Sequence, residues 1–172
     1  MTHVSRSSLL AFLEETFKTS IAPDVSYNGL QFEGSQNIAS IVTGVDASNE
    51  FFRQAARRKA DFAIVHHGLF WKGGEWKRLT RFEKEKMELL LKGNFSLYAL
   101  HLPLDSHPEL GNNAVMAQLL GLENLEPFSE YQGQKIGIKG RFPRPISRAQ
   151  LQTRIRQVVG PLTAKLDRKS VV

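Results

Sequence analysis

The stretch Asp61-Phe-Ala-Ile-Val65-His66-His67-Gly68 places two histidines directly after a run of apolar residues. A short, uninterrupted apolar run is typical of a strand that is covered on both faces. Adjacent side chains of a regular strand point to opposite faces, so the chain must bend if both imidazoles are to face one site. Gly68 permits that bend. The stretch therefore predicts a buried strand that ends in two imidazoles.

Strand and helix patterns alternate on both sides of this stretch. The apolar spacing predicts strands over 38–45, 61–65 and 95–100, and helices over 5–18, 48–59, 80–92 and 114–120. Because strand and helix alternate from residue 38 to residue 120, the order predicts an α/β protein with a largely parallel sheet and flanking helices.

Polar residues and glycines mark several of these helix ends. Ser48 is expected to cap the helix that follows it, and Thr80 with Glu83 predicts a capping box at the start of the next one. Gly93 is expected to end that second helix. In the turn-rich stretch after the first helix, Asn28-Gly29 suits positive φ angles.

The charge differs between two parts of the chain: residues 1–130, which we expect to form an α/β core, and residues 131–172, a basic α/β segment. The first part carries 13 Lys and Arg against 16 Asp and Glu, whereas the second carries 10 against Asp167 alone. Such a basic segment fits an anionic partner such as nucleic acid. We favour packing beside acidic surface of this chain or of a neighbouring subunit, because apolar residues separate the charges.

Within the basic segment the α/β pattern continues more weakly. The expected elements are a strand over 135–142, a helix over 147–159 with a capping box of Ser147 and Gln150, and a last strand over 162–172.

The composition excludes several classes of protein. With 172 residues, 41% hydrophobic and 23% charged, the chain can bury a core and is neither fibrous nor disordered. It lacks the run of about 20 apolar residues that a membrane helix needs. Glu14 and Glu15 interrupt the segment where a signal peptide would be apolar. The absence of cysteine excludes disulfides and thiolate metal sites, and we expect a cytoplasmic protein without membrane contact.

Residues that bind metals follow three of the predicted strands. Asp46 ends the first strand and the histidine pair ends the second; His101 follows the third, with Asp105 four residues later. Because the carboxyl ends of parallel strands meet at one edge, these side chains are expected to converge there. Two imidazoles and a carboxylate suit zinc, iron or manganese. The sequence therefore predicts a metal site of His66, His67 and Asp105, with His101 beside it.

Each of these residues also has an alternative role. The histidine pair would also suit hydrogen-bonded residues at a strand end, although we favour metal. His101 either binds the ion or supports a ligand. Asp46 either supports a ligand or caps the following helix. His3 and His107 are expected at the surface.

Other catalytic patterns are missing from the sequence. It contains no phosphate-binding loop, no dinucleotide-binding fingerprint and no serine-nucleophile elbow. The aromatic residues Phe70, Trp71 and Trp76 follow the histidine pair. They would line a pocket or an interface, or else pack in the core.

Two motifs resemble a known family. The segments DFAIVHHGLFW, residues 61–71, and YALHLPLDSHPELGNN, residues 98–113, are similar to the dinuclear-metal proteins called GTP cyclohydrolase I type 2 homologues. Tyr27-Asn-Gly-Leu-Gln and Gly44-Val-Asp-Ala-Ser also resemble N-terminal signatures of that family. The resemblance extends to about residue 165.

The resemblance implies a set of properties for this chain. His66, His67 and Asp105 would bind a two-metal centre, with His101 close by. The family forms toroidal hexamers, usually trimers of dimers, with the metal sites facing the interior cavity. Its name implies GTP cyclohydrolase activity, but metal-dependent hydrolysis of a phosphoester or nucleotide is the physically more natural reaction. The alternatives are a non-enzymatic hexameric scaffold for nucleic acid or protein, and a metal-binding protein without turnover.

The chain departs from the family pattern in one respect. Family members carry a further His, followed shortly by a Glu, beyond the matched residues, whereas the last such residues here are His107 and Glu130. We therefore expect a truncated form. Two close cations repel each other without a bridging carboxylate, so this chain is expected to bind at most one metal ion well. An uncovered sheet edge would favour association.

Overall fold

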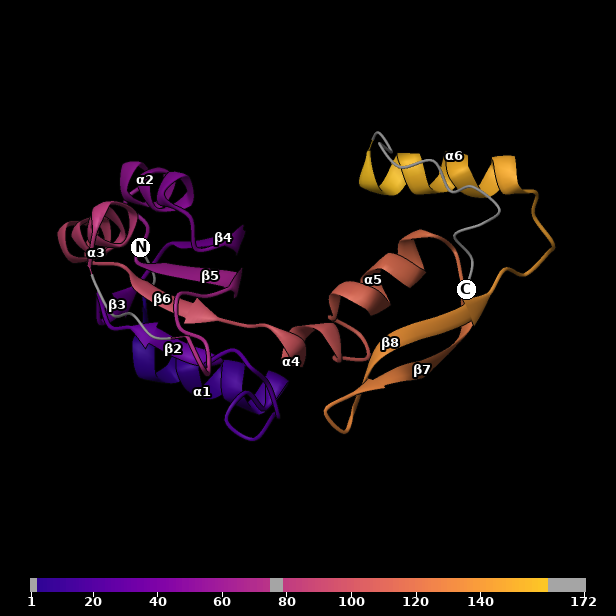
Figure 1. The fold of residues 1–172 in the computed structure, drawn as a ribbon, viewed down its shortest axis with the longest axis horizontal. Helices are drawn as coiled ribbons and strands as arrows, with labels where there is room; N and C mark the ends of the chain where they lie inside the picture. The colour runs from indigo at the N-terminus through magenta and orange to yellow at the C-terminus, as the bar shows by residue number, and fades with distance from the viewer. Residues whose placement is uncertain (1–2, 75–78, 161–172) are drawn as a thin grey trace.

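The computed structural model describes residues 3–74 and 79–160 (Figure 1). A four-stranded sheet with helices on its faces forms one half. A β-hairpin with two longer helices forms the other half, and the short helix α4 (Leu102–Asp105) lies between the halves.

The main sheet has the strand order β2-β6-β5-β4, formed by Gly29–Phe32, Ser96–Ala99, Phe62–His67 and Ile41–Asp46 respectively. β4, β5 and β6 are mutually parallel, whereas β2 runs antiparallel to β6. The predicted α/β fold is confirmed, with one antiparallel edge strand. Because Gly29 pairs with Ala99, β2 starts beside the carboxyl end of β6. The turn before β2 therefore lies at the edge of the sheet where β5 and β6 end.

Helices cover both faces of this sheet. α2 (Asn49–Arg57) and α3 (Arg81–Gly93) lie on one face, and α1 (Arg6–Phe17) lies on the other. Val65 of β5 packs in the cluster under α2 and α3, whereas Phe62 of the same strand packs in the cluster with Leu13 of α1. Burial on both faces explains why the sequence of β5 is almost continuously apolar.

The helix ends agree only in part with the sequence-based predictions. Ser48 caps α2, its Oγ accepting from Phe51 N at 3.1 Å. α3 begins where expected, but the Thr80 side chain makes no capping hydrogen bond, so the predicted capping box is wrong. Gly93 belongs to α3, and Asn94, with a φ of 49°, ends it instead. Asparagine tolerates this left-handed conformation because its short side chain bonds locally.

The second half begins after the short helix α4 (Leu102–Asp105). It contains α5 (Asn112–Leu119), β7 (Glu123–Tyr131), β8 (Gln134–Arg141) and α6 (Arg148–Val159). The capping box of α6 is confirmed.

β7 and β8 form an antiparallel hairpin, of which only β8 was predicted. β7 is exposed along almost its whole length, so it lacks the apolar alternation that reveals a strand. The division after residue 130 stays a prediction, and the hairpin pairs residues from both of its sides. The predicted strand over 162–172 lies outside the described residues.

Two small features complete the described fold. β1 (Val4–Ser5) pairs with β3 (Asn37–Ile38) beside the main sheet. Among residues 3–74 and 79–160, no helix has the length and apolar character to cross a membrane.

Candidate metal centre

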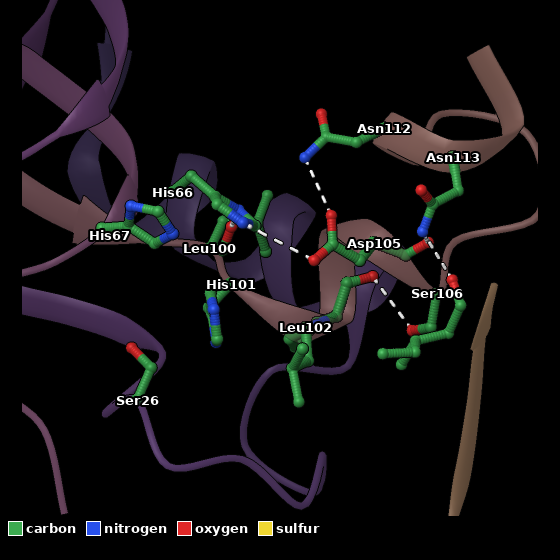
Figure 2. A network of polar contacts seen from close by, with 12 residues as sticks. Ser26, His66, His67, Leu100, His101, Leu102, Asp105, Ser106, Asn112 and Asn113 are labelled. Atoms are coloured by element: carbon green, nitrogen blue, oxygen red, sulfur yellow. Dashed lines mark hydrogen bonds and ion pairs between the residues drawn. The ribbon is translucent and has the colours of Figure 1, made fainter. Parts of the chain in front are cut away.

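Three imidazoles lie together at the carboxyl end of the main sheet (Figure 2). His66 and His67 end β5, and His101 follows β6. The ring centroids are 4.7 Å apart for His66 and His67, 4.8 Å for His66 and His101, and 5.6 Å for His67 and His101. One nitrogen of each ring lies within 4.8 Å of the other two. Parallel pairing of β5 with β6 explains this convergence.

The Nδ1 atom of every one of these imidazoles faces an oxygen acceptor. His66 Nδ1 lies 3.0 Å from the Leu100 carbonyl oxygen. His67 Nδ1 lies 2.7 Å from Asp46 Oδ1, and His101 Nδ1 lies 2.9 Å from Asp24 Oδ1. An acceptor at Nδ1 keeps the hydrogen on that nitrogen, so in the neutral ring Nε2 retains its lone pair. In this tautomer the Nε2 atom of each ring carries the electron pair that can bind a metal ion.

Asp105 joins this group from the end of α4. Its Oδ2 lies 3.5 Å from His66 Nε2, and its Oδ1 accepts a hydrogen bond from Asn112 Nδ2 at 2.9 Å (Figure 2). The hydrogen bond from Asn112 orients the carboxylate, so that Oδ2 faces His66. The carboxylate that was predicted to complete the site thus lies beside one of its histidines.

The other candidate residues lie around this group. Asp46 bonds to His67, as expected for a supporting residue, whereas Ser48 is the residue that caps α2. His3 is exposed, as predicted. His107 is half-buried: its Nδ1 accepts from Leu110 N at 3.0 Å, and its ring packs edge-on against Phe17. His107 therefore lies partly at the surface, and its imidazole also holds the turn after α4.

Asp24 is a part of the site that sequence reasoning missed. Its carboxylate is only 1% exposed and accepts hydrogen bonds from His101 Nδ1, from Asn28 Nδ2 at 2.7 Å, and from the backbone N–H groups of Ser26 and Leu102, each at 2.9 Å. Burial raises the pKa of Asp24, but the hydrogen bonds from Ser26, Asn28, His101 and Leu102 together outweigh burial and lower it.

The sequence around Asp24 did carry a local signal, because its residues are typical of a turn. An aspartate two residues before Ser26 can accept from that residue's backbone, as it does here. Its link to His101 depends on the antiparallel direction of β2, which brings this turn to the site. Asn28 in the same turn accepts from His101 N at 2.7 Å.

The donor set fits a transition-metal ion. Three imidazole lone pairs and an adjacent carboxylate are ligands that zinc, iron and manganese accept, whereas calcium prefers a shell of oxygen atoms alone. The hydrogen bonds to the Nδ1 atoms resemble the outer contacts that orient metal-binding histidines. His66, His67, His101 and Asp105 can therefore hold such an ion, and that role stays a prediction.

Comparison with known proteins gives the family of this chain. A family model described as Duf34/NIF3 (NGG1p interacting factor 3) matches residues 4–170. The chain belongs to the Duf34/NIF3 family. Relatives named GTP cyclohydrolase 1 type 2 homolog confirm the resemblance drawn from the sequence motifs. The one from Deinococcus radiodurans is 39% identical over 159 residues, and the one from Pyrococcus horikoshii is 46% identical over 142 residues.

The match covers most of this Duf34/NIF3 chain but only part of its relatives. It spans 92% of this chain and 60% of the Deinococcus protein, and 83% of this chain and 56% of the Pyrococcus protein. The crystal structure of TTHA1606 from Thermus thermophilus is 40% identical with a TM-score of 0.80, covering 91% of this chain and 62% of that one. HcgD from Methanocaldococcus jannaschii, 22% identical with a TM-score of 0.79, shares the fold over 93% of this chain and 62% of its own.

Proposed function

We propose that this chain binds a divalent metal ion and takes part in metal-dependent hydrolysis of a phosphoester or nucleotide. The observation that carries the proposal is the convergence of three imidazoles whose Nδ1 atoms are all held by oxygen acceptors. When bound in such a site, a zinc, iron or manganese ion lowers the pKa of a water ligand and polarises a phosphoryl oxygen.

Each residue of the site has a distinct part in this proposal. His66, His67 and Asp105 act as metal ligands, and His101 binds the ion or holds a ligand or substrate beside it. Asp46 and Asp24 orient the imidazoles of His67 and His101 through the hydrogen bonds to their Nδ1 atoms. These contacts fix the orientation of the two imidazoles and thereby reduce the reorganisation that metal binding requires.

The test measures metal content and turnover together. The purified protein is supplied with Zn²⁺, Mn²⁺ or anaerobic Fe²⁺ and assayed with GTP and with bis(p-nitrophenyl) phosphate. We expect turnover that requires metal and is lost in His66→Ala, because that substitution removes one of the converging donors. His3→Ala is the matched control, since His3 is exposed and outside the group. Turnover that survives both chelation and His66→Ala would refute the proposal.

A second candidate function is a non-enzymatic scaffold that binds nucleic acid. It is favoured by one observation: residues 131–160 carry seven Lys and Arg and no Asp or Glu. Three of the seven lie opposite glutamates of β7 in the hairpin, so this contact would depend mainly on the other four. This function predicts binding to nucleic acid that weakens steeply with salt and is unchanged in His66→Ala. Lack of binding at low salt would exclude it. Metal binding without any turnover would indicate the third alternative, a metal-binding protein that is not an enzyme.

The assembly of the protein is also a proposal. By family resemblance we propose a hexamer built as a trimer of dimers. A largely apolar cavity of about 810 Å³ between α1, the end of the sheet and α5 supports association. Leu110 and Leu119, which line it, are 54% and 62% exposed. Burial of such residues is a common basis for contacts between subunits.

A further inference from the structure

A second cavity, of about 400 Å³, lies beside the candidate metal centre, and three of the residues that line it are Tyr27, Phe70 and Trp71. We propose that this aromatic cavity binds the planar heterocyclic ring of a nucleotide, so that the substrate is a nucleotide rather than a simple phosphoester. This inference rests on the proposed hydrolysis for the reaction, but binding of the ring can be measured without turnover.

The walls of the aromatic cavity are held together before any ligand binds. Ser26 and Trp71 form an antiparallel bridge. The backbone N–H of Tyr27 donates to the Phe70 carbonyl at 3.1 Å, and that of Lys72 donates to the Val25 carbonyl at 2.7 Å. These bonds join the turn before β2 to the segment after β5. Preformed walls of this kind reduce the conformational entropy that ligand binding would cost.

The amide of Gln31 fixes the same two segments to each other. Its Oε1 accepts from Leu69 N at 2.6 Å and from Phe70 N at 3.3 Å. Its Nε2 donates to the carbonyl oxygens of Tyr27 at 2.7 Å and Phe70 at 3.3 Å. Both lone pairs and both hydrogens of this amide are thereby used, so Gln31 supports the cavity without offering hydrogen bonds to a ligand.

Aromatic side chains of the lining offer a ligand surfaces for stacking. Tyr27 is 54% exposed. Asn28 also lines the cavity. Its Oδ1 accepts from His101 N, and its Nδ2 donates to Asp24 Oδ2. Every nucleobase has a π-face, so stacking selects planar rings with little discrimination between bases.

Trp71 connects this cavity to the histidine group. Its indole Nε1 donates to the Gly68 carbonyl at 3.0 Å, which fixes the ring. The ring centroid lies 5.1 Å from that of His101, edge to face, and 6.0 Å from that of His67. Because Trp71 lines the cavity and also contacts these two imidazoles, a base in the aromatic cavity would lie beside the histidine group. We infer that its sugar and phosphate would extend toward the proposed metal ligands.

The experiment compares GMP, AMP and ribose 5-phosphate, which share a phosphorylated ribose but differ in the base. Binding to the full chain is measured by isothermal titration calorimetry, without turnover. We expect GMP and AMP to bind with similar affinity and ribose 5-phosphate about tenfold more weakly. Tyr27→Ala should weaken GMP binding about tenfold, whereas Tyr27→Phe should retain it. Tyr131→Ala is the matched control, because Tyr131 is exposed on β7, away from the cavity.

Two results would overturn the inference. One is equal affinity for GMP and ribose 5-phosphate, and the other is unchanged GMP binding in a folded Tyr27→Ala protein, with folding checked by its thermal unfolding. If metal-dependent turnover is present in that case, the proposed hydrolysis stands and only the base-binding cavity is refuted. If GMP binds through Tyr27 but no substrate is turned over, the cavity stands and the proposed hydrolysis is refuted.

Discussion

Among single residues, the carboxylate of Asp24 controls the orientation of His101. It is almost fully buried in the turn before β2, and its two oxygens accept from two side chains and two backbone N–H groups. Burial raises its pKa, but these hydrogen bonds outweigh burial and lower it, so the carboxylate is anionic at neutral pH. An anionic acceptor holds the hydrogen of His101 on Nδ1.

Asp24→Asn should therefore weaken metal binding without preventing folding. In this variant an amide NH2 group replaces one carboxylate oxygen. That NH2 group would face N–H groups that now donate hydrogen bonds to the oxygen. We expect the affinity for Zn²⁺ to fall by about 10- to 100-fold, as is common when such outer contacts are lost. Competition with a fluorescent chelator measures this change.

Asp61→Asn is the control for Asp24→Asn. Asp61 Oδ2 also accepts from two backbone N–H groups, those of Ala39 at 2.9 Å and Ser40 at 3.0 Å, but Asp61 belongs to no part of the histidine group. We expect Asp61→Asn to lower stability and leave Zn²⁺ affinity unchanged. Equal Zn²⁺ affinity in Asp24→Asn and the unmodified protein would show that Asp24 does not position His101.

Metal stoichiometry is a further prediction about these side chains. One nitrogen of each imidazole lies within 4.8 Å of the other two in the described group, and two close cations repel each other unless a carboxylate bridges them. We expect at most one tightly held ion per chain after dialysis, measured by elemental analysis of the intact protein. Two retained ions per chain would contradict this expectation.

Among the helices and strands, α2 and α3 show how capping differs between two similar starts. Ser48 Oγ accepts from Phe51 N, whereas the Thr80 side chain makes no equivalent bond. Ser48 therefore satisfies one backbone N–H group at the start of α2, whereas the Thr80 side chain satisfies none at the start of α3.

Ser48→Ala should lower the free energy of unfolding by about 1 kcal/mol, because the N–H group of Phe51 loses its partner. Thr80→Ala should change it much less, since no capping bond is lost. Urea unfolding at equilibrium measures both variants under the same conditions. A loss for Thr80→Ala as large as that for Ser48→Ala would show that the two caps are equivalent in solution.

In the molecule taken as one body, exposed apolar surface surrounds the carboxyl end of the sheet. Val45 of β4 is 62% exposed and lines the same cavity as Leu119 of α5. Within residues 3–74 and 79–160, β4 pairs with β5 alone, so its outer edge has unpaired backbone groups. Both features favour association with another chain.

We expect the native mass in solution to be roughly six times the 19.4 kDa of the chain. Leu119→Asp should reduce this mass, because it would bury an unpaired charge at a subunit contact. Leu91→Asp is the control, since Leu91 is similarly exposed on α3 and does not line the cavity. Light scattering after size exclusion measures both. A monomer at all concentrations, or equal masses for the two variants, would contradict the proposed assembly.

Local patterns of residues were enough to predict several parts of this protein. The apolar run of β5, the cap at Ser48 and the capping box of α6 depend on neighbours within a few residues, so their patterns could be read directly. The convergence of His66, His67 and His101 followed from the parallel order of β5 and β6.

The direction of β2 and the surroundings of the histidines became known only from the three-dimensional fold. β2 could have joined the sheet in either direction, and its antiparallel pairing is what brings Asp24 to His101 and Tyr27 to Trp71. β7 could not be predicted for a related reason. It is a strand because it pairs with β8, and its own sequence has no apolar pattern that would indicate one. Pairing between distant segments depends on the packing of the whole chain, and no local pattern of residues encodes it.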